Sequence, residues 1–194
     1  MSADPPSIID LVAGCRLAVR EVVGIDLDFT QDTLPLLDYY VAQAKGTKEE
    51  IAQLVAPMCG AYFGEVLRRT LGPASWDVPE DAEPSEFRLQ FENVFLELNP
   101  LGVALEALMR AKVEDWGGHL EVRPADRGLV ENAVELFGEV REEDYFRFGV
   151  RYEVIEQVAQ ALLRQSEREG GTPGRPFDAT AYARAREGLG PVLH

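Results

Sequence analysis

Four residues in the first half of the sequence combine side-chain types that can carry out acid–base chemistry. Glu65, Arg68 and Arg69 lie within five consecutive positions, and Trp76 follows a Gly-Pro pair. A carboxylate that acts as general base, beside a guanidinium that holds an anion, is an arrangement suited to proton transfer. One hypothesis is therefore an enzyme of unknown reaction, with Glu65 and either arginine in a cleft near Trp76.

The same residues also fit a structural role, which we favour. Glu65 and Arg69 are four positions apart with the acid first, an order that stabilises a surface helix by about 0.3–0.5 kcal/mol. If Glu65 points inward, it can accept hydrogen bonds from backbone groups of the loop that carries Trp76, and the indole can pack on the helix. A general base also needs a second group within hydrogen-bond reach, and the sequence offers no obvious one. We therefore predict no catalytic residue here and an anchor between a helix and a sheet.

Other residue types that carry out catalysis or bind metals are sparse. The histidines are His119 and His194, and the cysteines are Cys15 and Cys59, which form no CxxC motif. Ser-His, Cys-His and metal chemistry require more of these residues at suitable spacing. We predict no metal and no cofactor, and we interpret both cysteines as buried free thiols. The segment GGTPGRP at 170–176 lacks the preceding strand and the Lys-Ser/Thr of a phosphate-binding loop, so it is interpreted as a linker.

The charge of the chain favours some partners and disfavours others. The net charge is −15, from 34 acidic and 19 basic residues. Nucleic acids are bound through Lys and Arg, so we predict no nucleic-acid partner. The sequence shows no secretory signal and no run of about 18 apolar residues, which predicts a cytoplasmic protein with no membrane partner. An acidic surface attracts basic partners, so we predict a non-enzymatic protein-binding domain, of the adaptor or immunity type, whose partner is a protein and a basic one.

Apolar residues at spacings of three and four predict α-helices along most of the chain. Thr47 and Glu50 form a capping box. Pro35 favours a 3₁₀ first turn or a later helix start, and Pro57 should kink the helix in which it lies. Gly60 and Gly64, one turn apart, permit another backbone to approach. With their caps and stops, the predicted helices are 7–23, 30–46, 47–72, 99–112, 126–137, 145–168 and 178–189.

The segment FRLQFENVFLELN predicts a β-hairpin with strands 87–91 and 94–98. With Glu92-Asn93 as a two-residue turn, apolar contacts and charge pairing select the same register. The expected pairs are Phe91 with Val94, Leu89 with Leu96, Phe87 with Leu98 and, on the other face, Arg88 with Glu97. The segment 119–122 can add a short strand.

Together these elements predict an α+β fold with N-terminal helices, a small antiparallel sheet with a central hairpin, and C-terminal helices. Residues 1–168 are expected to form a single domain, followed by a linker at 169–177 and a tail at 178–194 with a short helix. The apolar residues of the tail can dock on the body or on a partner, and disorder is the third possibility.

Two segments taken together resemble a group of uncharacterised bacterial domains of unknown function, of the DUF3806 and DUF6278 type. LDFTQDTLPLLD at 27–38 resembles a Leu-Asp-aromatic-Ser/Thr pattern that ends in Leu-Asp, here with Asp38. AYFGEVLRRTLGPASW at 61–76 resembles an aromatic-x-Gly-Glu pattern followed by a basic pair, Gly and Trp. The likeness spans roughly residues 25–112 and implies a shared small α+β domain, but no reaction. The motif positions with an expected structural role are Asp38, Tyr62, Gly64, Glu65, Arg69, Trp76 and Asn99.

Overall fold

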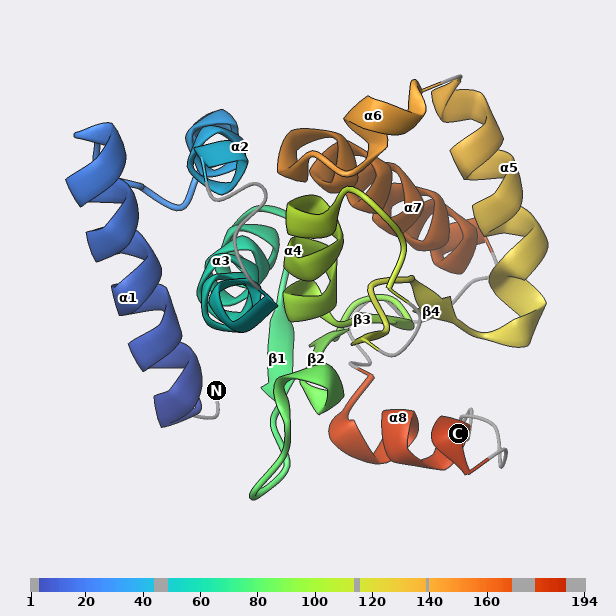
Figure 1. Ribbon diagram of the computed structural model, residues 1–194. Helices are drawn as coiled ribbons and strands as arrows, with labels where there is room; N and C mark the ends of the chain where they lie inside the picture. The colour runs from blue at the N-terminus through green and yellow to red at the C-terminus, as the bar shows by residue number, and fades with distance from the viewer. Residues whose placement is uncertain (1–3, 44–48, 114–115, 139, 169–176, 188–194) are drawn as a thin grey trace.

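The computed structural model describes residues 4–43, 49–113, 116–138, 140–168 and 177–187 (Figure 1). It confirms the α+β class, because helices flank a four-stranded antiparallel sheet of order β1-β2-β3-β4. The strands are β1 (Ala74–Asp77), β2 (Arg88–Phe91), β3 (Leu96–Leu98) and β4 (Glu121–Val122). The helices are α1 (Pro6–Val23), α2 (Leu34–Gln43), α3 (Glu49–Thr70), α4 (Pro100–Met109), α5 (Arg127–Phe137), α6 (Glu142–Tyr145), α7 (Phe148–Arg168) and α8 (Ala179–Arg186).

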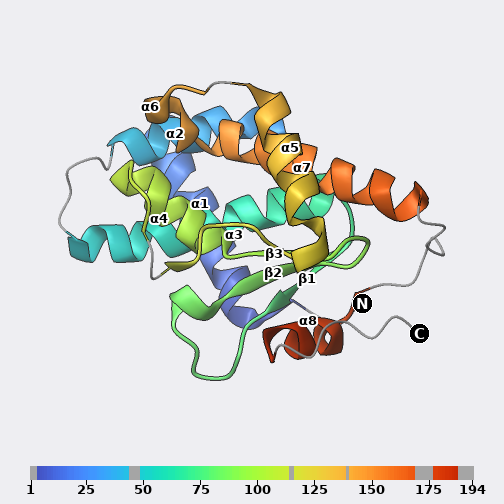
Figure 2. The same ribbon diagram turned by 90° about the vertical axis from the view of Figure 1, so that its right-hand side faces the viewer.

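The sheet lies between two helical layers. Helices α1 to α4 and α7 lie on one side of it, and α8 lies on the other (Figures 1 and 2). The main core fills the space between the sheet and the larger layer, where Phe63, Leu67, Leu89 and Leu96 are fully buried. Helix α3 runs through the centre of this layer, so its residues meet both the other helices and the sheet.

Several helix ends follow local rules that the sequence displays. Gly24 ends α1 in the left-handed region at φ +78°, where glycine carries no steric penalty. A 3₁₀ turn at Gln31–Thr33 precedes α2, as the position of Pro35 predicts. Asn99 caps α4 by accepting hydrogen bonds from the backbone N–H groups of residues 101 and 102, at 2.9 and 3.2 Å. The predicted cap at Thr47 lies outside the described residues.

The close approach of another backbone that was predicted at Gly60 and Gly64 is confirmed at Gly60, whereas at Gly64 a side chain approaches. A Cβ atom at Gly60 would lie 2.4 Å from the Cα atom of Leu101, which is backbone of α4. A Cβ atom at Gly64 would lie 2.4 Å from the indole of Trp76. Both glycines therefore let other parts of the fold lie directly against the α3 backbone. The helix is continuous through Pro57.

The predicted hairpin is present, but its predicted register is wrong by two residues. Leu89 pairs with Leu98 and Gln90 pairs with Glu97, so the expected pairing of Leu89 with Leu96 and of Arg88 with Glu97 does not occur. A shift of two residues keeps each side chain on its face, so the apolar face is as predicted. The loop between the two strands, residues 92–95, is correspondingly longer than the predicted two-residue turn.

The predicted short helix of the tail is α8, and it docks on the hairpin. The hydroxyl of Tyr182 donates to the carbonyl oxygen of Phe91 at 2.7 Å and accepts from the N–H of Leu96 at 3.0 Å. The ring of Tyr182 stacks on that of Phe95 with centroids 4.4 Å apart. A two-residue turn would leave no opening for this hydroxyl, so contacts from a distant segment stabilise the longer loop.

Strand β1 was not predicted. Its residues follow Gly72-Pro73 and pair with β2, Trp76 opposite Leu89. The strand is too short for its own periodicity to reveal it, and its pairing with β2 defines it.

Candidate functional site

The structure brings the two motif segments into contact with each other. The ring of Tyr62 on α3 stacks on that of Phe29 with centroids 5.2 Å apart. The Tyr62 hydroxyl accepts a hydrogen bond from the Phe29 N–H at 2.8 Å and lies 2.9 Å from the hydroxyl of Thr33. The guanidinium of Arg69 lies over the ring of Phe29, 3.7 Å from its centroid. This is a favourable cation–π contact. The turn before α2 is thus fastened to α3.

Glu65 lies next to this cluster and is buried, with 3% of the residue exposed. Its Oε1 accepts from Arg68 Nε and from Trp76 Nε1, both at 3.0 Å. Its Oε2 accepts from Arg68 at 2.8 Å and from Arg69 Nε at 3.5 Å. Burial acts to raise the pKa of Glu65, but the hydrogen bonds from Arg68 and Trp76 outweigh it and hold the pKa below its ordinary value. The carboxylate is therefore ionised and surrounded by donors at neutral pH.

The partners of Glu65 differ from those the sequence hypothesis assigned. We expected backbone N–H groups of the loop, whereas every described donor is a side chain. Trp76 does lie on α3, where its ring covers Gly64. This geometry joins α3 to β1, and it leaves the carboxylate with little capacity to accept a proton from a substrate.

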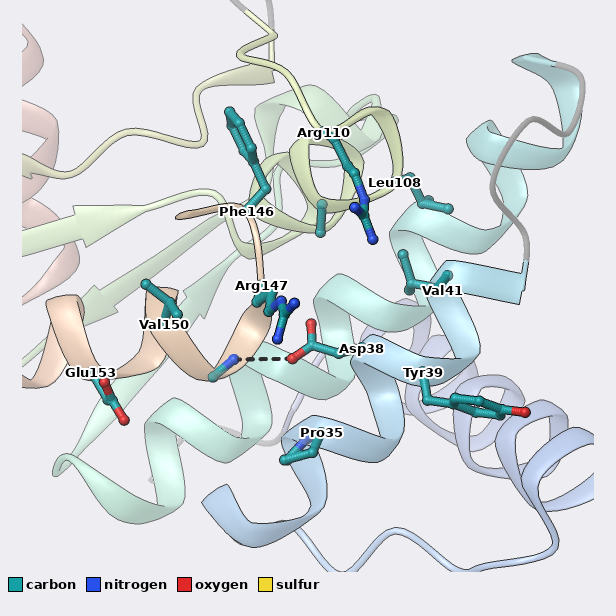
Figure 3. Close-up of a pocket in the computed structure, with 13 residues that line it drawn as sticks. Pro35, Asp38, Tyr39, Val41, Leu108, Arg110, Phe146, Arg147, Val150 and Glu153 are labelled. Carbon is teal, nitrogen blue, oxygen red and sulfur yellow. Dashed lines mark hydrogen bonds between the residues drawn. The ribbon is translucent and has the colours of Figure 1, made fainter. Parts of the chain in front are cut away.

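A pocket of about 460 Å³ lies elsewhere, between α2, the end of α4 and the start of α7 (Figure 3). Its volume is in the range of small-molecule sites, which are mostly apolar with a few convergent polar groups. Of the residues named in the sequence analysis, Pro35 and Asp38 line it, whereas Glu65 and Trp76 do not. The lining residues are Pro35, Asp38, Tyr39, Val41, Ala42, Ala107, Leu108, Arg110, Phe146, Arg147, Gly149, Val150 and Glu153.

Asp38 joins α2 to the start of α7 at this pocket. Its carboxylate accepts a hydrogen bond from the N–H of Phe148 at 2.7 Å and from that of Gly149 at 3.5 Å, both at the N-terminus of α7. The positive end of a helix dipole favours a carboxylate at this position. Burial is nevertheless the largest influence and raises the pKa of Asp38 above its ordinary value. The aspartate thus caps α7 from a position 110 residues earlier in the chain.

Two arginines lie beside Asp38 in the pocket (Figure 3). Arg147 pairs with Asp144 at 2.8 Å. Arg110 follows the last residue of α4 in the left-handed conformation, at φ +50°, which costs an L-residue other than glycine roughly 1–2 kcal/mol. The positive charges of Arg147 and Arg110 both act to lower the pKa of Asp38. Sequence patterns did not reveal these arginines; the only local signal is the missing glycine at the end of α4.

The remaining candidates of the sequence analysis lie apart from both clusters. His119 is exposed and lies 3.4 Å from Glu121. Cys15 and Cys59 are buried free thiols, as predicted, and the contact with Cys15 and burial raise the pKa of Cys59. In the described segments, no group of three or more His, Cys, Asp or Glu residues is arranged to hold a metal ion. Among the same residues, no helix has both the length and the apolar character needed to cross a membrane.

Comparison with known proteins agrees with the resemblance seen in the sequence. Curated proteins and solved structures give no match. A family model does match, and the matched residues include both motif segments, 27–38 and 61–76. The resemblance to the DUF6278 type is thereby confirmed for residues 1–90, which match the family of unknown function DUF6278.

Proposed function

We propose that the protein is a non-enzymatic binding domain that recognises a basic region of another protein through its acidic surface. It would act as an adaptor or as an immunity-type protein that neutralises a basic partner. The net charge of −15 supports this proposal. A surface of one charge sign raises the association rate with partners of the opposite sign and disfavours partners of the same sign.

The observation that carries the proposal is the loop between β1 and β2. The segment 77–86, DVPEDAEPSE, contains acidic residues and no basic one, and the loop projects from the body of the molecule (Figure 1). Its exposed acidic residues are Glu80, Asp81, Glu83 and Glu86. A projecting loop of one charge sign presents its carboxylates to a partner without steric hindrance from the body.

The protein already binds one of its own basic side chains beside this loop. Arg186 of α8 contacts Glu97 at 2.7 Å and Asp77 at 2.9 Å. Glu97 is buried and also accepts from Gln90 at 2.6 Å. The outer face of the sheet therefore has the chemistry to recognise a guanidinium, which is the group that a basic partner would present.

The alternative is an enzyme that uses Glu65 with Arg68 or Arg69 near Trp76. It has less support, because Glu65 is buried and its oxygens accept hydrogen bonds from all three of these residues. We place the protein in the bacterial cytoplasm. The two buried thiols agree with a reducing compartment, in which cysteines stay unpaired.

The test is affinity capture from native lysate at low salt, followed by mass spectrometry. The informative variant is Glu80→Gln with Asp81→Asn, because amide side chains keep the size of the loop and asparagine tolerates the left-handed conformation of Asp81, at φ +60°. The control is Glu131→Gln with Glu135→Gln, which removes the same charge from the exposed face of α5.

We expect one or a few basic proteins to be captured by the wild type and by the control. The loop variant should capture about tenfold less at low salt, since rim charges act mainly on the association rate. No reproducible capture by the wild type, or equal capture by the loop variant, would contradict the proposal.

A further inference from the structure

We propose that the pocket between α2, α4 and α7 binds a small organic oxyanion, a carboxylate or phosphate on a compact apolar body. This site is separate from the acidic loop of the proposed function, and the inference does not depend on that function.

Among the charged groups of the pocket, the exposed guanidinium of Arg110 is available to a ligand. Asp38 accepts from the backbone of α7 at 2.7 Å, and Arg147 is paired with Asp144 at 2.8 Å. Arg110 makes no hydrogen bond and no ion pair with any described residue. An arginine offers five N–H donors in a planar fork that matches a carboxylate or a phosphate. Arg110 can therefore donate hydrogen bonds to an anion that enters the pocket.

The backbone conformation of Arg110 supports the same conclusion. A helix that ends in the left-handed region usually has glycine at that position, whereas here Arg110 adopts it at φ +50°. Strain of this kind is concentrated at functional sites. Figure 3 shows the Arg110 side chain directed into the pocket toward Arg147 and Asp38. Arginine at this position thus has an unfavourable backbone conformation and places a guanidinium where the pocket has space.

The remaining walls determine the kind of molecule that carries the anion. Val41, Leu108, Phe146 and Val150 form an apolar lining around a volume of about 460 Å³. Glu153 is the other acid of the lining, and Figure 3 shows it beyond Val150, with its carboxylate away from the arginines. The oxyanion would therefore lie between Arg110 and Arg147, with the apolar body against the aliphatic side chains and Phe146.

The experiment is titration of the ¹⁵N-labelled full-length chain with phenylacetate, phenyl phosphate and phenol, followed by amide chemical shifts. The key variant is Arg110→Gly, which removes the guanidinium and accepts the left-handed conformation without strain. The control is Arg164→Ala, which removes one positive charge from an exposed site on α7 outside the pocket lining. Equilibrium unfolding checks that Arg110→Gly is at least as stable as the wild type.

We expect saturable shifts at Val41, Leu108 and Gly149 with one or both anions. Arg110→Gly should weaken binding at least about tenfold, the loss of one good charged contact, and Arg164→Ala should bind within about twofold of the wild type. Binding of phenylacetate alone identifies a carboxylate ligand, and binding of phenyl phosphate alone identifies a phosphate. The inference is overturned if neither anion shifts these amides, if phenol shifts them equally, or if Arg110→Gly binds as the wild type does.

Discussion

Replacing Glu65 by glutamine removes one negative charge and one acceptor oxygen from the side chain that joins α3 to β1. The carboxylate accepts from Arg68 at 2.8 and 3.0 Å and from Trp76 at 3.0 Å. An amide nitrogen cannot accept a hydrogen bond, so the substitution loses at least one of these contacts. It also removes the charge that Arg68 and Arg69 face.

The size of the effect follows from these contacts. Removing one member of a buried ion pair costs about 3–5 kcal/mol when the other charge is left without a partner. Arg68 keeps a second partner, Asp4, at 2.8 Å, and its side chain is 22% exposed, so the cost is lower. Hydrogen bonds to charged groups contribute about 1.5–3 kcal/mol each. We expect Glu65→Gln to lower the free energy of unfolding by about 2–3 kcal/mol at neutral pH.

The pH dependence provides a second signature of the same contacts. The pKa of Glu65 is lower in the folded chain than its ordinary value, so the unfolded chain takes up this proton first as the pH falls. The stability from Glu65 is therefore complete above its ordinary pKa, near 4.3, and is lost as the pH falls through the folded value. The difference between wild type and Glu65→Gln should shrink below about pH 4.

Urea unfolding followed by far-UV circular dichroism, repeated from pH 7 downward, measures both quantities. Glu131→Gln on the exposed face of α5 is the matched control and should change the free energy of unfolding by less than about 0.5 kcal/mol. Trp76→Phe removes the indole donor, and the double variant should show a coupling energy of about 0.5–3 kcal/mol with Glu65→Gln. If Glu65→Gln unfolds within about 0.5 kcal/mol of the wild type at pH 7, the anchor role is refuted.

Three further predictions test other contacts of the fold. Measured by urea unfolding, Gly60→Ala should lower the free energy of unfolding by about 2–3 kcal/mol, because the new Cβ would meet α4 backbone at 2.4 Å. The control Gly128→Ala, with no atom within 4 Å, should raise the free energy of unfolding by up to about 1 kcal/mol. Equal effects at the two glycines would contradict the packing argument. Tyr182→Phe should speed hydrogen exchange of the α8 amides about 10- to 100-fold, because it removes the hydrogen bond of 2.7 Å from the Tyr182 hydroxyl to the hairpin. Unchanged exchange would mean that this hydrogen bond does not hold α8 in place. Burial raises the pKa of Asp38, so the contribution of Asp38 to stability falls as the pH rises from about 4 through the folded pKa. In urea unfolding at a series of pH values, Asp38→Asn should lack this decline. If the variant retains the decline, another group causes it.

Local physical chemistry in the sequence determined most helices and their ends. The Asn-Pro pair at 99–100 predicts the cap of α4, and Asp178 predicts the cap of α8, whose carboxylate accepts from the backbone N–H of residue 181 at 2.9 Å. The two glycines of α3 predict the close approach, and alternation predicts which face of the hairpin is apolar. Each of these predictions depends on residues within a few positions of each other, which is the range over which capping and periodicity act.

Tertiary structure decided the hairpin register, strand β1 and the composition of both clusters. Tyr182, whose hydroxyl lies in the hairpin loop, is 91 positions from Phe91, whose carbonyl oxygen accepts its hydrogen bond. Asp38 is likewise 110 positions from Phe148, whose N–H donates a hydrogen bond to its carboxylate. The sequence names Glu65, Trp76 and Asp38 as residues of interest, but not their partners. Burial and long-range hydrogen bonds select those partners, because an apolar or charged side chain carries no local signal of which distant segment it will meet.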